Sequence, residues 1–274
     1  MGLLPLPLPP QVFSILKGVI ENRGGLHYQL VDLDLLANRV SPRARDLGFD
    51  SLLDYYYFVR FDPKGLDELD ALLEDLVVHE TFFFREAEQL RMLVDGFLAP
   101  LVLSGVKPRV WCAAAATGEE PYTLAMLLAE RGLLTKVELV ASDLCESLLA
   151  HARTGLYGGR SLRAVEGTIA GRWLEPRDDK FQVPARLREA IAWRRVNLIE
   201  PAQIEALGIF DAILCRNVLI YFGDQTSTRV VQTLTSALRS GGLLLVGASE
   251  SLMMLGTSLR CEERSGTFFY RKST

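Results

Sequence analysis

The stretch 109–130 constrains the fold more than any other part of the chain. Residues 109–112 form an apolar run typical of a buried strand, and an apolar-rich helix begins near Pro121. The turn between them, 113–118, contains four alanines and Gly118 but few bulky side chains, so a ligand can approach its backbone closely. Strand, small-residue turn and helix together predict the opening of an α/β nucleotide-binding unit.

Two carboxylates at the start of this helix, Glu119 and Glu120, restrict the ligand. A helix N-terminus offers unpaired N–H groups and partial positive charge, which suit a phosphate, but paired carboxylates disfavour one. We therefore expect a neutral or cationic ligand with hydroxyl or ammonium groups, such as S-adenosylmethionine. The missing G-x-G-x-x-G pattern also argues against an NAD-dependent enzyme. As an alternative, Thr117 and Glu120 have the spacing of a capping box, with no ligand role.

The composition sets broad limits on the class of protein. A chain of 274 residues suits one large domain or two unequal ones, and its net charge of −4 gives no reason to expect nucleic-acid binding. The four cysteines lack metal-ligand spacing and are expected as buried thiols in a reducing compartment. Residues 1–10 lack the basic start of a secretory signal, and no apolar run reaches transmembrane length. We expect a cytoplasmic protein without a metal, a membrane-inserted segment or a nucleic-acid partner.

The first part of the chain predicts helices only. Apolar residues recur at helical spacing over 11–95, with no strand signal. The expected helices cover 12–24, 33–40 (closed by Ser41 and Pro42), 52–61 (capped by Ser51), 66–78 and 90–103.

The segment 79–86 interrupts these helices with three consecutive phenylalanines, followed by Arg85. Three adjacent aromatic residues cannot lie on one helix face, so some must pack against a second body. One interpretation is a core plug with a solvent-facing arginine. The other is a linker that lays Thr81 and Arg85 across the mouth of the next domain's pocket.

From residue 107 onward, strands and helices alternate. A strand at 137–142 ends in Asp143, which is placed to bind ribose hydroxyls, to cap the helix that follows, or to do both. A short strand at 195–198 is expected to deliver Asn197. Residues 155–196 contain eight arginines and two adjacent glycines, which indicate an insertion at the rim of the sheet, facing an acidic partner or only solvent.

A second buried strand, 211–215, is followed by Arg216, Asn217 and Tyr221. Open α/β sheets bind ligands beyond the carboxyl ends of their strands, so these polar side chains favour a functional role. A helix at 226–238, a stop at 241–242, a strand at 243–246 and a final antiparallel edge strand at 268–271, paired near Arg260, complete the prediction.

These stretches together resemble the CheR family of chemotaxis receptor methyltransferases over nearly the whole chain. The resemblance rests on five motifs in the right order, at 81–86, 114–122, 141–143, 197–198 and 210–222. It implies an N-terminal all-helical domain at 1–85 and a Rossmann-like class I S-adenosylmethionine-dependent methyltransferase domain at 86–274. That α/β domain is expected to have a seven-stranded, mostly parallel sheet and a small inserted β-subdomain at about 158–195.

The resemblance also implies an activity, a partner and a set of site residues. The family transfers methyl groups from S-adenosylmethionine to glutamate side chains of membrane chemoreceptors, leaving S-adenosylhomocysteine and glutamyl methyl esters. The expected partner is the cytoplasmic helical domain of such receptors, and the chain is expected to be a monomer. Arg85 and Tyr221 would face the reacting centre, and either Glu119 or Glu120 could be the carboxylate that contacts the cofactor. The full set of expected cofactor contacts is Thr81, Arg85, Glu119, Glu120, Asp143, Asn197, Leu198, Arg216 and Asn217.

The residues suit this chemistry. A glutamate acceptor has an ordinary pKa of about 4.3 and is already ionised, so it needs no general base. A Ser-His-Asp or Cys-His arrangement is therefore not required, and alignment and water exclusion carry the reaction. The alternative is a cofactor-binding regulatory or scaffolding relative that acts as an interaction module. The presence of Arg85, Asp143, Arg216, Asn217 and Tyr221 argues against it.

Overall fold

The computed structural model describes residues 4–165, 167–264 and 266–273, and it divides into two compact units. The first unit runs to Val78 and also contains Tyr221–Thr226. The second unit contains His79–Ile220 and the chain from Ser227 onward. Residues 1–3, which open the segment considered as a secretory signal, lie outside the described residues. No helix in the described ranges has both the length and the apolar character needed to cross a bilayer.

The first unit is helical, as expected. Its helices are α1 (Pro10–Gly24), α2 (Leu33–Asp46), α3 (Leu52–Phe61) and α4 (Gly65–Leu76). The Ser51 hydroxyl accepts hydrogen bonds from the amides of Leu53 and Asp54, which confirms the predicted cap of α3. The predicted end of α2 at Pro42 is wrong. The helix continues to Asp46 with Pro42 inside it, although a proline there removes one ladder bond. In the same turn the Ser41 hydroxyl donates to the carbonyl of Ala37.

A buried ion-pair network joins three helices of this unit. Arg43 of α2 donates to both carboxylate oxygens of Glu68 in α4, at 2.6 and 2.8 Å. The Tyr55 hydroxyl of α3 donates to the same carboxylate at 2.6 Å, and burial raises the pKa of this tyrosine. Because Tyr55 and Glu68 are buried, this network stabilises the helices only while the Glu68 charge is compensated.

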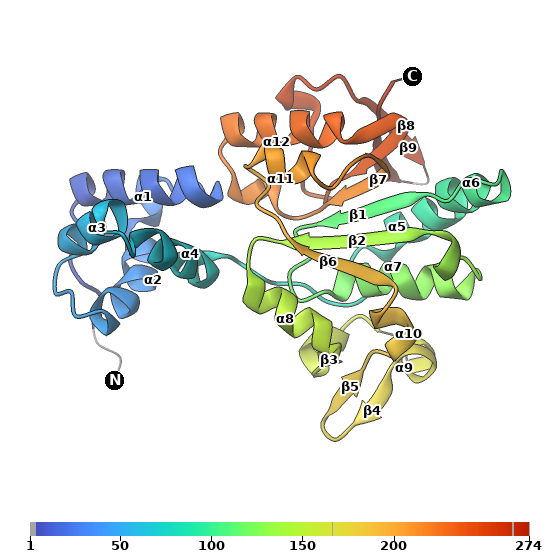
Figure 1. Cartoon of the computed structure of the whole chain (residues 1–274), viewed down its shortest axis with the longest axis horizontal. Helices are drawn as coiled ribbons and strands as arrows, with labels where there is room; N and C mark the ends of the chain where they lie inside the picture. The colour runs from blue at the N-terminus through green and yellow to red at the C-terminus, as the bar shows by residue number, and fades with distance from the viewer. Residues whose placement is uncertain (1–3, 166, 265, 274) are drawn as a thin grey trace. The chain divides into compact units, whose positions relative to one another are not determined.

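The second unit is built on a seven-stranded sheet (Figure 1) in the order β6-β2-β1-β7-β8-β10-β9. The first five strands pair in parallel, and β10 pairs antiparallel with both β8 and β9. This arrangement confirms the predicted fold class. The strands are β1 (Arg109–Ala113), β2 (Glu138–Asp143), β6 (Ile191–Arg195), β7 (Phe210–Cys215), β8 (Leu238–Leu245), β9 (Arg260–Arg264) and β10 (Thr267–Arg271).

Three predicted details of the sheet are wrong. Strand β6 ends at Arg195, where its pairing with Asp143 ends, so Asn197 follows the strand instead of lying in it. The predicted stop at 241–242 lies inside β8, where the register with β7 shifts. Glycine is needed at 242 because a Cβ there would lie 2.8 Å from the carbonyl oxygen of Arg239 and 2.9 Å from that of Asp211. The edge strand is β9 and not β10, which leaves Cys261 exposed while the other three cysteines are buried.

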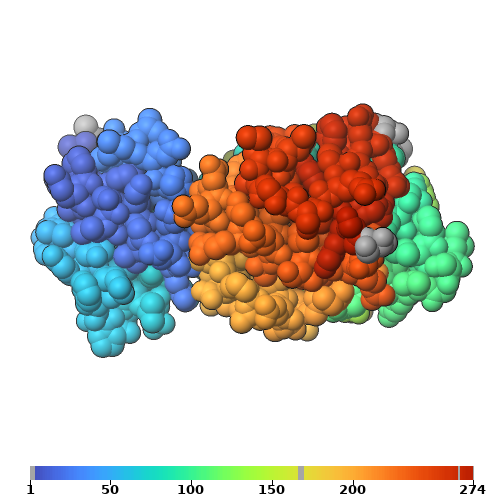
Figure 2. Space-filling view, turned by 90° about the horizontal axis from the view of Figure 1, so that it is seen from above, coloured from blue at the N-terminus to red at the C-terminus, as the bar shows by residue number. Residues whose placement is uncertain are grey.

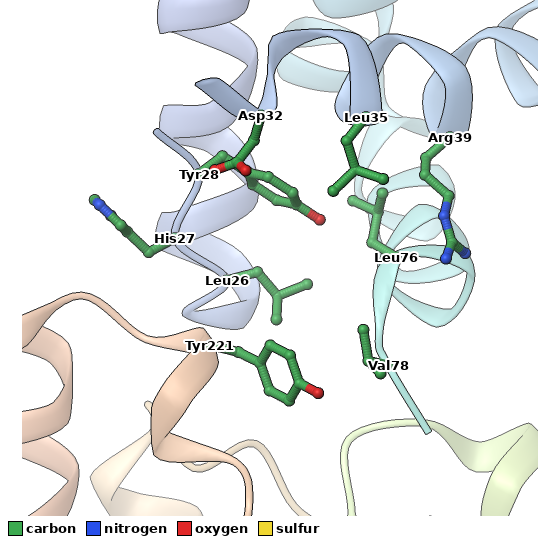
Figure 3. Close-up of a pocket in the computed structure, with 9 residues that line it drawn as sticks. All are labelled: Leu26, His27, Tyr28, Asp32, Leu35, Arg39, Leu76, Val78 and Tyr221. Atoms are coloured by element: carbon green, nitrogen blue, oxygen red, sulfur yellow. The ribbon is translucent and has the colours of Figure 1, made fainter. Parts of the chain in front are cut away.

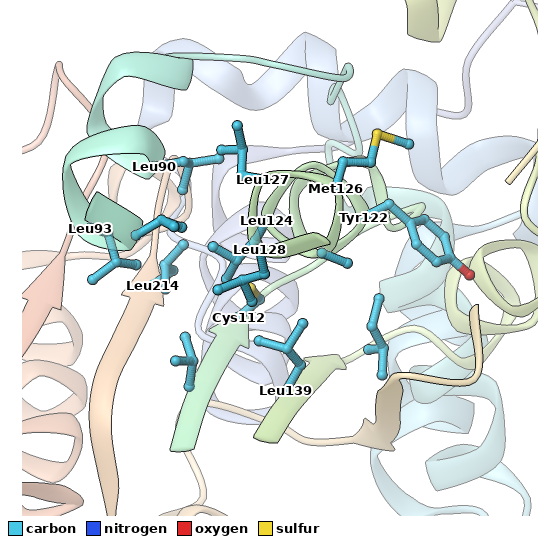
Figure 4. Close-up of a cluster of buried hydrophobic side chains, with 14 of the residues drawn as sticks. Leu90, Leu93, Cys112, Tyr122, Leu124, Met126, Leu127, Leu128, Leu139 and Leu214 are labelled. Carbon is cyan, nitrogen blue, oxygen red and sulfur yellow. The ribbon is translucent and has the colours of Figure 1, made fainter. Parts of the chain in front are cut away.

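Helices pack on the sheet and position its carboxyl end. Figure 4 shows Leu124 and Leu128 of α7 (Glu119–Glu130) pointing toward Cys112 of β1 and Leu139 of β2. The expected helix at 90–103 is confirmed; it is a continuous helical stretch of α5 (Ala87–Leu93), a π-helical turn (Val94–Leu98) and α6 (Ala99–Leu103). The remaining helices of the main body are α8 (Glu146–Thr154), α11 (Pro201–Glu205) and α12 (Asp224–Ser236). In Figure 2 the C-terminal part of the chain, orange to red, forms a continuous area of the surface.

The insertion after α8 is a small subdomain, as the resemblance implied. Its antiparallel sheet has the order β3-β5-β4, formed by β3 (Leu156–Tyr157), β4 (Glu175–Arg177) and β5 (Lys180–Gln182). The helices α9 (Gly167–Trp173) and α10 (Ala185–Arg188) accompany this sheet. Strand β6 then returns the chain to the main sheet.

Candidate active site

The small-residue turn between β1 and α7 has a strained backbone. Ala114, Ala116 and Gly118 adopt left-handed conformations, with φ of 58°, 47° and 96°. Gly118 is also sterically required, because a Cβ there would lie 2.9 Å from Ala152 and from Trp193. Alanine in this conformation is unfavourable by about 1 kcal/mol or more, and such strain tends to persist at functional sites.

The predicted capping box at the start of α7 does not form. The helix begins at Glu119, so that Pro121 lies in its first turn as predicted, and its N-cap, Gly118, has no side chain to cap it. Thr117 donates its hydroxyl hydrogen bond to the Glu119 carboxylate at 2.6 Å instead. Glu120 is therefore free of the capping role, and its carboxylate bonds to Arg216.

Asp143 connects this turn with the start of α8. One carboxylate oxygen accepts from the amide of Ala116 at 2.8 Å, and the other accepts from the amide of Cys145 at 3.0 Å. The residue is only 6% exposed. A carboxylate at the carboxyl end of a parallel strand is also a suitable acceptor for ribose hydroxyls. The cap-like bond and the acceptor role weighed from the sequence are compatible.

Arg216, directly after β7, is the centre of a buried charge cluster. Its side chain is 2% exposed and donates to the Glu120 carboxylate at 2.6 Å and to the Glu86 carboxylate at 3.0 Å. A third bond, at 3.1 Å, goes to the backbone carbonyl of Arg85. The Nε atom of Arg216 is buried and has no hydrogen-bond partner among the described residues.

The two carboxyls of this cluster have pKa values that shift in opposite directions. Burial raises the pKa of Glu120, and the opposing effect of Arg216 does not cancel it. At Glu86, burial also raises the pKa, but Arg216 and the amide of Ala248 lower it more, so the net shift is downward. One guanidinium shared by two carboxylates leaves the more buried one, Glu120, incompletely neutralised. A cationic ligand at this position would be attracted to Glu120.

The phenylalanine segment fixes the backbone that leads to Arg85. Phe83 and Phe84 are buried, and their amides donate to the Ser161 carbonyl and the Thr123 hydroxyl. The Arg85 side chain, one-third exposed, donates to the carbonyl of Glu80 at 3.0 Å. The segment thus serves as a core plug, while Arg85 and the half-buried Thr81 remain available to a ligand.

Asn217 is held in a left-handed conformation, φ 58°, by a carboxylate that the sequence analysis did not select. Glu250 accepts from the amides of Asn217 at 2.7 Å, Leu219 at 2.8 Å and Gly247 at 2.6 Å. Glu86 was missed as well. Both are acidic residues close to predicted site segments, and Glu250 follows a predicted strand, which was the available signal.

Asn197 and Leu198 follow β6 and are both buried. The Asn197 side-chain oxygen accepts from the backbone amide of Ile199 at 3.2 Å. The backbone amide of Asn197 donates to the side-chain oxygen of Gln203 at 2.8 Å. The amide of Val196 donates to the carbonyl of Asp143 at 3.0 Å. These bonds bring the Asn197 backbone next to the end of β2.

Tyr221 belongs to the first unit and not to the unit that holds the other predicted residues. It lines a pocket of about 190 Å³ together with Leu26, Tyr28, Leu35 and Arg39 (Figure 3). The amide of His27 donates to the Tyr221 carbonyl at 2.8 Å. Its predicted catalytic role therefore stays a prediction.

The arrangement at the ends of β1, β2 and β7 fits S-adenosylmethionine. The turn 113–118 allows close approach, Asp143 presents a carboxylate at the end of β2, and Glu120 favours a cationic group. The buried Nε of Arg216 has no acceptor in the described part of the chain. Among the described residues, no group of metal-ligating side chains comes together. The fold and this site define a class I S-adenosylmethionine-dependent methyltransferase.

The comparisons with known proteins agree with this class. Residues 79–267 match the domain described as CheR methyltransferase, SAM binding domain, and residues 11–77 match the CheR methyltransferase all-alpha domain. The chain belongs to the CheR methyltransferase family. The cofactor predicted from the sequence is thereby confirmed.

Curated relatives cover most of the chain. It is 32% identical over 266 residues to chemotaxis protein methyltransferase 2 of Vibrio cholerae, covering 94% of this chain and 92% of the relative. It is 35% identical over 226 residues to chemotaxis protein methyltransferase 2 of Pseudomonas aeruginosa, covering 80% of this chain and 79% of the relative. A probable biofilm formation methyltransferase, WspC of Pseudomonas putida, is 31% identical over 244 residues, covering 88% of this chain and 57% of the relative.

Proposed function

We propose that this methyltransferase transfers a methyl group from S-adenosylmethionine to glutamate side chains of chemotaxis receptors, forming glutamyl methyl esters. The observation that carries the proposal is the bond from Arg216 to the backbone carbonyl of Arg85. It supports the proposal because it holds the backbone of the segment that carries Arg85 next to the residue that follows β7. A guanidinium binds carboxylates in fork geometry, and a carboxylate is the acceptor in this reaction.

The reaction requires alignment more than acid–base catalysis. S-adenosylmethionine supplies a methyl group on a sulfonium; a C–O bond forms as the C–S bond breaks, and the electron pair of that bond goes to sulfur. No proton moves, because the glutamate is already ionised. The residues of the chain therefore contribute by orienting the carboxylate and excluding water.

We assign roles to the site residues on this basis. Asp143 accepts from ribose hydroxyls, Glu120 attracts the cationic part of the cofactor, and Arg85 holds one oxygen of the acceptor glutamate. Tyr221 contributes to the reacting centre when the acceptor is bound. Thr81, Asn197, Leu198, Arg216 and Asn217 complete the cofactor contacts. The partner is the cytoplasmic helical domain of a membrane chemoreceptor, to which the chain binds as a cytoplasmic monomer.

Methyl-labelled S-adenosylmethionine tests the proposal. The chain is incubated with the cofactor and with receptor-containing membranes from its source cell, and the labelled receptor is treated with base. Glutamyl methyl esters release labelled methanol under base, and mass spectrometry locates the modified glutamates. Label that resists base or lies on another residue type refutes the proposed acceptor. Cofactor binding without any transfer would favour the interaction-module alternative.

A further inference from the structure

The carboxylate of Glu119 lies between two parts of the catalytic unit that are distant in sequence. Glu119 is 1% exposed, although it is charged and begins a helix. One oxygen accepts from the hydroxyl of Thr117, in the turn 113–118 (the cofactor turn), at 2.6 Å. The other accepts from the Ser161 hydroxyl of the inserted subdomain at 2.8 Å. A buried carboxylate is retained only where such donors satisfy it.

Ser161 also holds the segment that carries Arg85. Its carbonyl accepts from the amide of Phe83 at 2.9 Å. The adjacent residue of that segment, Phe84, donates to the Thr123 hydroxyl, which in turn donates to the carbonyl of Glu119 at 2.7 Å. The segment is therefore tied to Glu119 along two routes.

Further contacts join the same three elements. The Tyr157 hydroxyl of the insert donates to the carbonyl of Thr117 at 2.5 Å. Arg163 of the insert pairs with Glu80 at 2.8 Å and lies 4.0 Å from the centre of the Phe82 ring. The insert thus contacts both the cofactor turn and the Arg85 segment, and the Glu119 carboxylate is the buried group that bonds to two of these elements at once.

We propose that Glu119 and Ser161 are positioning residues, which hold the cofactor turn and the Arg85 segment in register with the inserted subdomain. This inference rests on the proposed function for its effect on turnover. It assigns Glu119 a role different from that of Glu120, whose carboxylate bonds to Arg216. Because coupling between two sites is reciprocal, cofactor binding at the turn stabilises the insert, and ordering of the insert favours the cofactor-ready turn.

Hydrogen exchange tests the coupling without any acceptor protein. In the wild type, saturating S-adenosylhomocysteine should slow amide exchange in 80–86 and in 157–163, as well as in the turn 113–118. In Ser161→Ala, protection of the turn should remain, while protection of 157–163 is lost. Equal protection of 157–163 in both proteins, or none in the wild type, would overturn the inference whether or not receptors are methylated.

Turnover tests the positioning role. At saturating cofactor, Ser161→Ala should lower kcat on the order of tenfold, the effect expected from losing one charge-assisted hydrogen bond. Ser161→Thr keeps the hydroxyl and should restore most of the rate. The matched control, Ser147→Ala at an exposed site on α8, should behave as the wild type. An Ala variant as active as the wild type, or a Thr variant as poor as Ala, contradicts the role.

A second variant keeps the positioning role testable if Ser161→Ala does not fold. Thr117→Val removes the other hydroxyl donor while keeping the side-chain shape, and it should lower kcat by a similar factor. Because both hydroxyls bond to one carboxylate, the double variant should lose less than the product of the two single losses. Fully multiplicative losses would show that the hydroxyls act separately and refute the shared role of Glu119. Wild-type chain that binds cofactor but methylates no glutamate would refute the proposed function alone.

Discussion

Replacing Arg216 by methionine tests whether the buried charge cluster stabilises the catalytic unit. Methionine fills much of the same volume but leaves the carboxylates of Glu86 and Glu120 without their shared guanidinium. Breaking a buried ion pair by removing one partner costs about 3–5 kcal/mol, and the Arg216 side chain is only 2% exposed. We expect a loss of about 4 kcal/mol in the free energy of unfolding near neutral pH.

The loss should depend on pH. Without the guanidinium, burial and mutual repulsion raise the folded-state pKa of both carboxyls above their unfolded values. The folded variant then binds more protons than its unfolded state, so its stability falls as the pH rises through the raised pKa values. The deficit relative to the wild type should therefore be largest near neutral pH and smaller at pH 5.

Denaturant unfolding at several pH values measures this deficit. The matched control is Arg131→Met, because Arg131 also pairs with a carboxylate, Asp95, at 2.8 Å, but the two side chains are 47% and 46% exposed. An exposed pair is worth about 0–1 kcal/mol, so the control should change little. A loss at Arg216 below about 1 kcal/mol, or one that is equal at pH 5 and pH 7.5, would refute the reasoning.

Four further predictions concern single residues. Arg85→Lys should lower kcat on the order of 10²-fold and barely change the affinity for S-adenosylhomocysteine, because alignment of the acceptor needs the guanidinium fork. Steady-state kinetics and calorimetric titration measure the two effects, and equal losses of kcat and affinity would reassign Arg85 to the cofactor. Asp143→Ala should weaken S-adenosylhomocysteine binding by about 1–3 kcal/mol, and unchanged calorimetric affinity would remove its ribose role. Affinity should fall as the pH drops through the raised pKa of Glu120, since its protonated form no longer attracts the ligand's ammonium group. Glu120→Gln should flatten that dependence, and equal slopes in calorimetric titrations would contradict it. Arg43→Ala should lower the free energy of unfolding of the helical unit, measured in urea, by about 3 kcal/mol, because it leaves the buried Glu68 carboxylate without its ion-pair partner. A loss under about 1 kcal/mol would show that Glu68 does not need this partner.

Much of the catalytic unit could be predicted because its information is local. A buried strand followed at once by polar residues, as at Asp143 and Arg216, identifies the ligand end of a parallel sheet. The small residues before α7 likewise indicate that a ligand approaches the backbone closely there. The family motifs then supplied the strand number and the insert, which periodicity alone did not give.

The remaining features depend on contacts between residues far apart in the chain. Glu250 lies 33 residues from Asn217, whose amide it binds. Its place after a predicted strand indicates the ligand end of the sheet but does not identify Asn217 as its partner. The misread stop at 241–242 has in part a similar origin, because a Cβ at Gly242 would lie 2.9 Å from the distant carbonyl of Asp211, besides 2.8 Å from the local carbonyl of Arg239. The assignment of Tyr221 to the helical unit also follows from long-range packing.

The helical unit is formed by two separate segments of the chain, which limits how this protein can be divided into fragments or fused with a relative. The chain passes between the two units after Val78, after Ile220 and after Thr226. Leu26 forms an antiparallel bridge with Phe222, inside the segment that returns to the helical unit. A fragment that ends at Val78 would therefore lack residues 221–226, which belong to the helical unit. A chimera that exchanges only the first helices would pair Leu26 of one protein with Phe222 of another. Substitutions around Leu26 and Phe222 are accordingly expected to covary, although residues 79–220 of the catalytic unit separate them in the sequence.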